Sequence, residues 1–256
     1  MNTLRIEHCT AGYQKNKPVL EDISLCIEEG EITVLLGENG CGKTTLLRAL
    51  QGNLTHTSGK ILVGETDITA LSPRRRAVYV TTMHQQQPDT AGLTGMDRIE
   101  TAFYPVRGPF FSLTDRDRER ITAAAQTFGA EHLLHRELGK MSTGERQMIA
   151  LLRAAVQDTP VLLLDEPASA LDYNHTQTLF ALLHTLAGQG KIILAVLHDP
   201  AAALLHASKL VHLGGGGVRG ILDVKKADHR EAEAFLRKLY PQIRVHDDPL
   251  FCYTEQ

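Results

Sequence analysis

The stretch Leu36-Gly37-Glu38-Asn39-Gly40-Cys41-Gly42-Lys43-Thr44-Thr45 decides the fold of this chain of 256 residues. It follows a short apolar segment, residues 32–36, that is typical of a strand, and it leads into an apolar helical pattern over residues 44–50. The stretch fits the pattern G-x-x-x-x-G-K-[ST] at a strand-to-helix turn. The sequence therefore predicts a loop that holds a phosphate.

The residue types in this loop suit a nucleotide. Gly37, Gly40 and Gly42 permit backbone dihedrals that a side chain would hinder, so that successive N–H groups turn inward. The helix that begins near Lys43 adds free amides and the positive end of its dipole. We expect Lys43 to reach the outer phosphates and the Thr44 hydroxyl to ligate a bridging Mg²⁺. The alternative is a glycine-rich turn that matches by accident.

Composition and charge exclude several classes of protein. Hydrophobic residues make up 43% of the chain, which is ample for a buried core, and the net charge of −3 argues against a general nucleic-acid binder. The basic run Arg74-Arg75-Arg76 follows Pro73, and we expect a solvated turn there rather than a recognition patch. No segment approaches the ~20 apolar residues that span a bilayer, and no signal sequence opens the chain. The expected location is the cytoplasm.

The cysteines show no paired spacing of the kind that binds metal. They are expected to be free thiols. A thiol among the amides of the phosphate loop is either reactive or a passive packing residue, and the sequence leaves both open for Cys41. The four residues are Cys9, Cys26, Cys41 and Cys252.

Hydrophobic patterning predicts an α/β fold with a mixed sheet. Residues 3–9 and 23–27 alternate in strand fashion around the turn-forming Asn16-Lys17-Pro18, which predicts antiparallel strands at the N-terminus. Later apolar runs alternate with helical stretches such as residues 174–187, which indicates parallel strands. These runs are residues 161–164, 192–197 and 210–213.

Helix formers dominate residues 88–158, with helical spacing over residues 115–128 and 145–156. We therefore expect one domain over residues 1–256: a P-loop NTPase core with a helical subdomain inserted at about 88–158. Residues 228–240 are expected to form an amphipathic helix that Pro241 ends.

A second motif supplies acidic groups. Val161-Leu162-Leu163-Leu164-Asp165-Glu166 is an apolar strand that ends in two carboxylates. Because neighbouring residues of a strand point to opposite sides, Asp165 is expected to support Mg²⁺ while Glu166 orients and deprotonates a water. An acidic strand end is common by itself, but together with the phosphate loop it predicts phosphoryl-transfer chemistry.

A third motif marks the start of a helix. Met141-Ser142-Thr143-Gly144-Glu145-Arg146-Gln147 places Ser and Gly before a helix with Glu in its first turn. The simpler interpretation is a helix cap. The other is a second anion site, far from the first in sequence.

The order of these motifs, together with Tyr13, Ser169-Ala170-Leu171-Asp172 and His198-Asp199, resembles that of the ATPase subunits of ABC transporters. Within that family the chain is similar to the subunits that energise uptake of iron-siderophore, haem and cobalamin chelates. The grounds are Leu71-Ser72-Pro73-Arg74, Ala154-Ala155-Val156-Gln157-Asp158-Thr159-Pro160 and Leu236-Arg237-Lys238-Leu239-Tyr240.

The resemblance implies ATP and Mg²⁺ as cofactors and a role for each matching residue. Tyr13 would stack on adenine, Glu166 would be the general base, and His198 would contact the γ-phosphate. Asp172 would cross the interface of a head-to-tail homodimer, where Ser142 and Gly144 would serve the partner's ATP. The phosphate-binding residues would be Gly37, Glu38, Asn39, Gly40, Cys41, Gly42, Lys43, Thr44 and Thr45, with Lys43 also catalytic. From the residues alone, Tyr13 fits an ordinary tyrosine at a sheet edge as well as it fits an adenine-stacking residue. His198 also fits a polar residue that ends a strand without a functional role.

The chain departs from the family pattern in three places. The family usually has a glutamine, with a role in catalysis and Mg²⁺ binding, directly after the strand at residues 77–80, but Thr81-Thr82-Met83-His84 stands there. Gln85, Gln86 and Gln87 follow, and counting back from Leu93-Thr94 favours Gln85. Met141 and Thr143 replace a usual Leu and Gly, and Thr143 is expected to lower activity by adding a Cβ. Ala168 replaces a usual Thr.

We therefore expect a Mg²⁺-ATP-dependent subunit of an ABC importer. Its partners would be a second copy of the chain, two membrane permease subunits and, indirectly, a substrate-binding protein, but no nucleic acid. It would sit peripherally on the cytoplasmic face of the membrane. The alternative is a soluble ABC-type ATPase that acts in assembly or regulation without a permease, and a small-molecule kinase is a weaker third hypothesis.

Overall fold

The protein combines two main sheets with helices on either side, in a computed structural model that describes residues 3–83, 92–108, 110–169, 171–245 and 252–254. Gln85, which the sequence assigns to Mg²⁺ and catalysis, lies outside these described residues. Among the described residues, no helix has the length and apolar character needed to cross a lipid bilayer.

The first sheet is antiparallel and has the strand order β2-β1-β4-β5. Leu4 pairs with Ile27 and Ile6 with Leu25, so the alternating segments at the N-terminus are antiparallel neighbours, as predicted. The strands are β1 (Thr3–Gly12), β2 (Leu20–Glu28), β4 (His56–Val63) and β5 (Thr66–Asp67).

The second sheet has the order β10-β9-β3-β8-β7-β6, in which β9, β3, β8, β7 and β6 are parallel and β10 is an antiparallel edge. The sequence pattern correctly predicts this mixed sheet. The strands are β3 (Ile32–Leu36), β6 (Val80–Met83), β7 (Val161–Asp165), β8 (Ile192–Val196), β9 (Lys209–Gly214) and β10 (Gly217–Asp223).

Two hydrophobic cores cover the two faces of this second sheet. In β7, Leu163 packs into the core that contains β1, β2 and helix α1 (Lys43–Gln51), whereas Leu162 and Leu164 pack into the core that contains the other helices. Because the strands are buried on both faces, they are continuous apolar runs rather than alternating ones. Burial on both faces holds the strand ends, where the motifs lie, in fixed positions.

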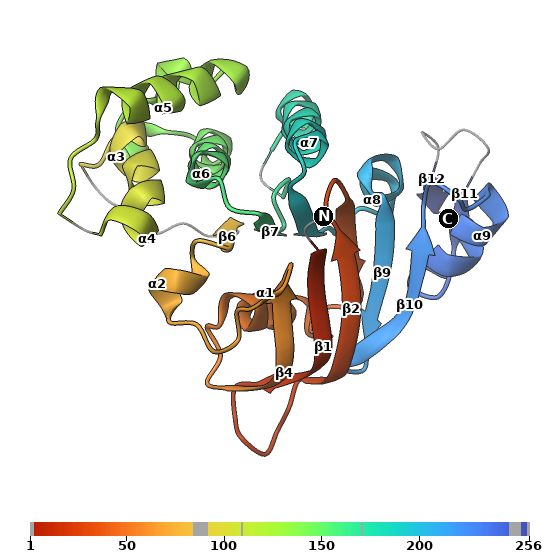
Figure 1. Cartoon of the computed structure of the whole chain (residues 1–256). Coiled ribbons are helices and arrows are strands. Elements are labelled where there is room, and N and C mark those ends of the chain that lie inside the picture. The colour runs from red at the N-terminus through yellow and green to blue at the C-terminus, as the bar shows by residue number, and fades with distance from the viewer. Residues whose placement is uncertain (1–2, 84–91, 109, 170, 246–251, 255–256) are drawn as a thin grey trace.

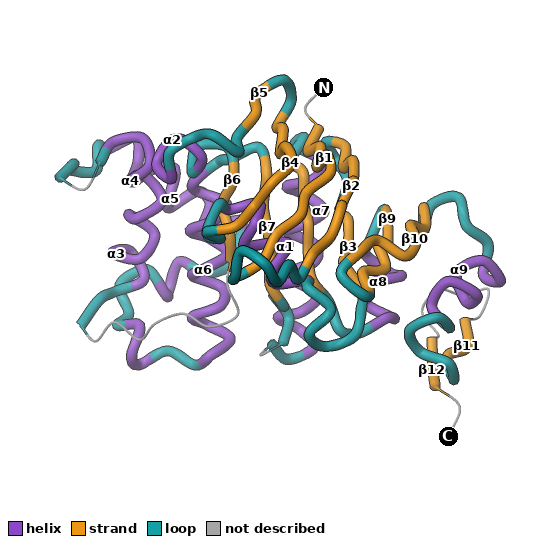
Figure 2. Tube along the Cα trace, turned by 90° about the horizontal axis from the view of Figure 1, so that it is seen from below, coloured by secondary structure: helices purple, strands orange, loops and turns teal. Residues whose placement is uncertain are grey.

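A block of helices lies between β6 and β7 in the chain, although these two strands are neighbours in the sheet. In both views the block projects to one side of the sheets (Figure 1, Figure 2). It comprises α3 (Gly95–Glu100), η1 (Thr101–Phe103), α4 (Tyr104–Arg107), α5 (Asp115–Thr127), η2 (Glu131–Leu133), η3 (Leu138–Lys140) and α6 (Thr143–Gln157). Capping boxes at Thr94, Thr114 and Ser142 begin α3, α5 and α6.

The rest of the chain continues on the helical face of the second sheet. α7 (Tyr173–Gly188) and α8 (Pro200–His206) pack there, and α9 (His229–Leu236) lies with β11 (Ile243–Val245) and β12 (Cys252–Thr254) on the side opposite the helical block (Figure 2). The predicted helix over residues 228–240 is too long. It ends at Leu236, whose carbonyl accepts hydrogen bonds from the amides of Leu239 and Tyr240 in a tightening turn.

The expectation of a solvated turn at Arg74-Arg75-Arg76 holds for the exposed Arg74 and Arg75 but is wrong for Arg76. Residues 73–76 form a short helix, α2 (Pro73–Arg76), and only 9% of Arg76 is exposed. Its guanidinium donates to the backbone carbonyls of Gln51, Ile68, Thr69 and Leu71. Because a fixed fork of donors can satisfy several carbonyls at once, an arginine can be buried here without a carboxylate.

Candidate functional site

Close contacts at two positions and positive φ angles at two account for the glycines of the loop after β3. A Cβ on Gly37 would lie 2.2 Å from the carbonyl oxygen of Leu213 in β9, and a Cβ on Gly42 would lie 2.5 Å from Leu20 Cδ2. Gly40 and Gly42 have φ angles of +79° and +111°, which favour glycine. The loop is therefore packed against β9 and β2.

Lys43 closes the loop from its own side. Its Nζ donates to the carbonyl oxygens of Gly37 at 2.7 Å and Glu38 at 3.0 Å, and only 7% of the residue is exposed. The ammonium thus lies inside the loop at the N-terminus of α1, where the helix dipole also favours an anion. Phosphate oxygens could replace the two carbonyls as its acceptors.

Thr44 and Asp165 are brought together from positions far apart in sequence. Thr44 Oγ1 donates to Asp165 Oδ1 at 3.4 Å, which joins the start of α1 to the end of β7. A hydroxyl and a carboxylate are hard oxygen ligands of the kind that Mg²⁺ takes, with waters and phosphates completing its shell. No group of three or more His, Cys, Asp or Glu side chains suited to a metal occurs in the described part of the chain. These two residues therefore fit Mg²⁺ that arrives with a nucleotide.

Glu166 contacts His198 across two neighbouring strand ends. Glu166 Oε1 and His198 Nε2 are 2.6 Å apart, and the Glu166 amide donates to Val196 O at 3.2 Å. Glu166 has φ = 52°, an unfavourable conformation for a residue with a side chain and one that concentrates at functional sites. A hollow of about 230 Å³ opens beside the pair and is lined in part by Ala168 and Asp199. The arrangement suits a base that acts on a water.

Gln147 in α6 supports the backbone at Glu166, a contact that sequence reasoning missed. Its Nε2 donates to Pro167 O at 2.5 Å and to Glu166 O at 3.3 Å, and it is 7% exposed. The Ser169 hydroxyl donates to the same Glu166 carbonyl at 3.0 Å. The available signal was a polar residue directly before the apolar run 148–152 of a helix, where a buried amide needs hydrogen-bond partners.

Tyr13 lies beside α1, next to the loop. Its hydroxyl accepts a hydrogen bond from Arg48 Nη1 at 3.1 Å and lies 3.4 Å from Thr45 Oγ1. The guanidinium of Arg48 is 5.7 Å from the centre of the tyrosine ring, and half of Tyr13 is exposed. The hydroxyl is therefore anchored to α1, while ring surface remains open for a planar group.

Ser142 begins α6 with a complete capping box. Its Oγ accepts from the Glu145 amide at 3.2 Å, and its own amide donates to Glu145 Oε2 at 2.7 Å. The hydrogen bond from the Ser142 amide lowers the pKa of Glu145, and Arg136 Nη1, 2.5 Å from that carboxylate, adds to the effect. Met141 is buried at 4% exposure, whereas Thr143 is exposed. Met141 thus packs into the core and leaves the polar part of the motif at the surface.

Asp172 caps a different helix. It accepts from the His175 amide at 2.9 Å at the start of α7, and this bond and the His175 side chain lower its pKa. Within the described residues, no hydrogen bond joins Ser142, Gly144 or Asp172 to the phosphate loop of the same chain. One chain thus brings Lys43, Thr44, Asp165, Glu166 and His198 together at the strand ends, and carries these other three residues at separate helix starts.

Comparison with known proteins agrees with this site. A family profile described as ABC transporter matches residues 20–169, more than half of the chain. The hemin import ATP-binding protein HmuV of Nocardia farcinica is 38% identical over 212 residues, which cover 81% of this chain and 71% of that protein. The iron(3+)-hydroxamate import ATP-binding protein FhuC of Bacillus subtilis is 32% identical over 213 residues, covering 83% and 77%.

The fold is also similar to that of solved structures. A structure described as an inward-facing conformation of a putative metal-chelate type ABC transporter has a TM-score of 0.78 and 23% identity. The superposition covers 100% of this chain and 96% of that one. At this level of identity the likeness supports the fold.

Proposed function

The chain belongs to the ABC transporter ATP-binding family and is an ATPase, and from this premise we propose that it energises an importer of metal chelates of the siderophore, haem or cobalamin type. The observation that carries the proposal is the Glu166–His198 contact at 2.6 Å, directly after Asp165 at the end of β7. The chelate cargo is supported by the import proteins that the chain resembles over most of its length.

The proposed roles follow from the contacts of each residue. Lys43 and the loop amides bind the phosphates, and Thr44 and Asp165 hold the Mg²⁺ that neutralises their charge. Glu166 accepts the proton of the attacking water, with the water held in the hollow at its side chain. His198 keeps the Glu166 carboxylate in place and lies where it can touch the terminal phosphate. Tyr13 stacks on the adenine.

A homodimer explains the residues that lie away from this loop. Ser142 and Gly144 occupy a capped helix start whose amides can bind the phosphates of the partner's ATP, and Asp172 lies at the interface. Two chains arranged head to tail would then enclose two ATP molecules. Because the γ-phosphate exists only before hydrolysis, it would act as a removable bridge between the copies.

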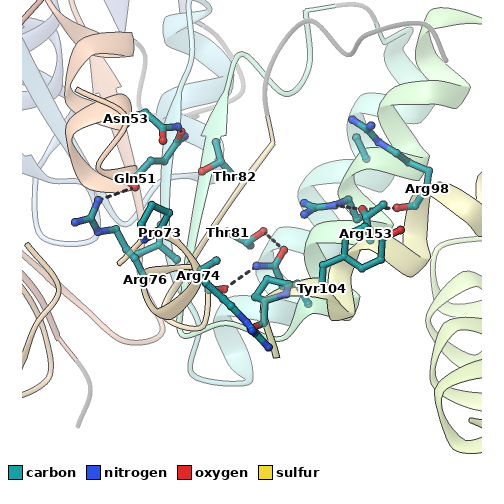
Figure 3. A pocket seen from close by; sticks show the side chains of 16 residues that line it. Gln51, Asn53, Pro73, Arg74, Arg76, Thr81, Thr82, Arg98, Tyr104 and Arg153 are labelled. Atoms are coloured by element: carbon teal, nitrogen blue, oxygen red, sulfur yellow. Dashed lines mark hydrogen bonds between the residues drawn. The ribbon is translucent and has the colours of Figure 1, made fainter. Parts of the chain in front are cut away.

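The permease is proposed to dock on a depression of about 690 Å³ between the core and the helical block (Figure 3). Its lining comes from α1, α2 and β6 on one side and from α3, α4 and α6 on the other. We propose that residues 88–158 act as a subdomain. A movement of the start of α6 at the bound nucleotide would then also shift the part of α6 that lines the depression. Two permease subunits would hold the ATPase dimer at the cytoplasmic face of the membrane and receive cargo from a binding protein.

The test uses the Glu166→Gln variant, which should bind ATP without turnover. Tagged protein is recovered from detergent-solubilised membranes of the host with Mg²⁺-ATP, and its partners are identified by mass spectrometry. The expected result is a multi-span permease, whose gene neighbours then define the cargo for uptake assays. Recovery with soluble proteins alone would instead favour a regulatory or assembly ATPase.

A further inference from the structure

Two histidines from different helices meet outside the site described above. His184 of α7 has its Nε2 3.4 Å from Nδ1 of His206, which is the last residue of α8. The two rings are tilted by 52°, and their centres are 5.6 Å apart. The pair joins two helices through nitrogen atoms that the proposed ATPase chemistry does not use.

The separation of these nitrogens suits a shared metal ion better than a hydrogen bond. Hydrogen bonds donated by N–H groups in proteins mostly have heavy-atom distances of about 2.7–3.2 Å, so a contact of 3.4 Å is a long one. Zn²⁺ binds histidine nitrogens at about 2.0–2.1 Å in tetrahedral geometry, which places two such nitrogens about 3.3–3.4 Å apart. Square-planar ligation would place neighbouring nitrogens only about 2.8–3.0 Å apart. The observed spacing is that of two corners of a tetrahedron.

His206 is held in place by the helix opposite. Its ring stacks on that of Phe180, with the ring centres 3.8 Å apart and an angle of 7° between the planes. Phe180 is 1% exposed and belongs to the helical core. Because Phe180 and His184 are four residues apart in α7, they lie on one face of that helix. This face thus supplies both the support for His206 and the second nitrogen.

His206 presents an unprotonated nitrogen at neutral pH. Burial lowers the pKa of His206 to about 4, and the neighbouring His184 adds to the effect. A neutral imidazole carries one proton, which either ring nitrogen can hold. With that proton on Nε2, His206 Nδ1 keeps a lone pair on the side of His184. Metal ions bind histidine in this neutral form.

We propose that His184 and His206 together bind Zn²⁺, or another divalent ion that prefers tetrahedral nitrogen ligation, and clamp α7 to α8. Imidazole is a usual ligand of Zn²⁺, Cu²⁺ and Ni²⁺, and the spacing of the nitrogens favours Zn²⁺ among them. His184 is exposed, so its ring can rotate to turn its lone pair toward the ion. The inference does not depend on the proposed transport function.

The ligand count makes this an exchangeable site. In the part of the chain that the structure describes, no third His, Cys, Asp or Glu joins the pair. Structural zinc sites have four protein ligands and no open position, whereas here water would fill the remaining positions. We therefore expect reversible binding that a chelator removes without unfolding the protein.

The clamp would act on helices that border the proposed active site. α8 begins at Pro200, two residues after His198, and Phe180 lines the hollow beside the Glu166–His198 pair. An ion at His206 would fix the helix that follows the histidine of this pair. It would thereby limit movement of α7 relative to α8 next to the hollow.

Zn²⁺ binding to the purified chain without nucleotide tests the inference. Metal-free wild type, His184→Ala and His206→Phe are titrated with ZnCl₂ in competition with a chromogenic chelator. His184→Ala changes an exposed residue, and His206→Phe keeps an aromatic ring on Phe180, so both variants should fold. Because loss of even a supporting partner weakens metal sites about 10–100-fold, each variant should bind Zn²⁺ at least about tenfold more weakly than wild type. His132→Ala, at an exposed histidine of η2, is the matched control and should bind like wild type.

Co²⁺ reports the geometry of the site. Tetrahedral Co²⁺ complexes absorb visible light much more strongly than six-coordinate ones. Wild type titrated with CoCl₂ should therefore show the strong bands, and both variants of the pair should lose them. Zn²⁺ should also raise the melting temperature of wild type but not of these variants, since an ion that binds only the folded protein stabilises it.

Three outcomes would overturn the inference. Equal Zn²⁺ affinity in wild type and in either His184→Ala or His206→Phe would place the metal at other residues. Only the weak bands of six-coordinate Co²⁺ in wild type would exclude the tetrahedral site. Wild type that binds no Zn²⁺ at millimolar concentration would leave the pair as a packing contact between α7 and α8.

Discussion

At the scale of single residues, Glu166 is the residue that we propose as the base for hydrolysis. Its carboxylate is 2.6 Å from His198 Nε2, while Lys43 and the loop glycines are positioned by other contacts. Glu166→Gln should lower ATP turnover by about 10²–10⁴, because an amide cannot accept the proton of the attacking water. Affinity for ATP should be retained.

Steady-state ATPase assays and nucleotide-binding titrations measure these two quantities separately. Glu119→Gln, at an exposed position on α5, is the control and should hydrolyse ATP at the wild-type rate. Full turnover by Glu166→Gln would show that another group is the base.

We propose Gln147 as a positioning residue, because it reaches from α6 to the backbone at Glu166. Gln147→Met keeps the size of the side chain but removes both donations to the carbonyls of Glu166 and Pro167. We expect kcat to fall about tenfold with little change in KM for ATP, since each lost hydrogen bond is worth about 1 kcal/mol. A purely structural role would instead lower the melting temperature and leave kcat intact. Gln189→Met, at the C-terminal cap of α7, is the matched control.

At the scale of elements, Asp117 attaches α5 to α4 within the helical block. Burial by itself would raise the pKa of Asp117, but hydrogen bonds from Thr114 and Arg107 outweigh it and hold this pKa at about 2. Because the pKa is lower in the folded protein than in the unfolded chain, this stabilisation is present above about pH 4 and is lost as the pH falls toward 2.

Asp117→Asn should therefore lower the free energy of unfolding at pH 7 by about 1–3 kcal/mol, the range for hydrogen bonds to charged groups. It should also flatten the dependence of stability on pH between about 4 and 2. Urea unfolding followed by circular dichroism measures both effects. Asp115→Asn, exposed in the first turn of the same helix, should show a smaller loss, and equal losses would argue against the buried contact.

At the scale of the whole molecule, the C-terminal region reaches back to the active site. The Tyr240 hydroxyl donates to His198 O at 3.2 Å, and burial, assisted by Asp199, raises the pKa of Tyr240 so that it remains a donor at neutral pH. The segment that follows α9 thus fixes the backbone of the histidine that contacts Glu166. The backbone position of His198 is thus linked to the packing of the segment that follows α9.

Tyr240→Phe should lower kcat by roughly two- to tenfold, as expected for one hydrogen bond, with KM for ATP unchanged. Tyr79→Phe, a partly buried tyrosine in the other core, is the control for loss of a hydroxyl. A rate for Tyr240→Phe equal to that of wild type would mean that His198 is held by its strand alone.

Much of the fold follows from local sequence patterns. The mixed sheet, its antiparallel N-terminal strands and the P-loop are confirmed, because alternating and continuous apolar runs differ visibly and glycines mark the strand-to-helix turn. The roles of individual site residues stay predictions. The expectation of a solvated side chain is wrong at Arg76, because the four carbonyls that bind Arg76 come from segments that no local pattern connects to it.

By itself, the sequence determined the family, the phosphate loop and the acidic strand end, since each of these depends on residues that are neighbours in the chain. Only the tertiary structure decided that Gln147 supports Glu166, that Tyr240 supports His198, and that His184 meets His206. These contacts join residues 19 to 42 positions apart, and their geometry depends on how the helices pack on the sheet rather than on spacing along the chain.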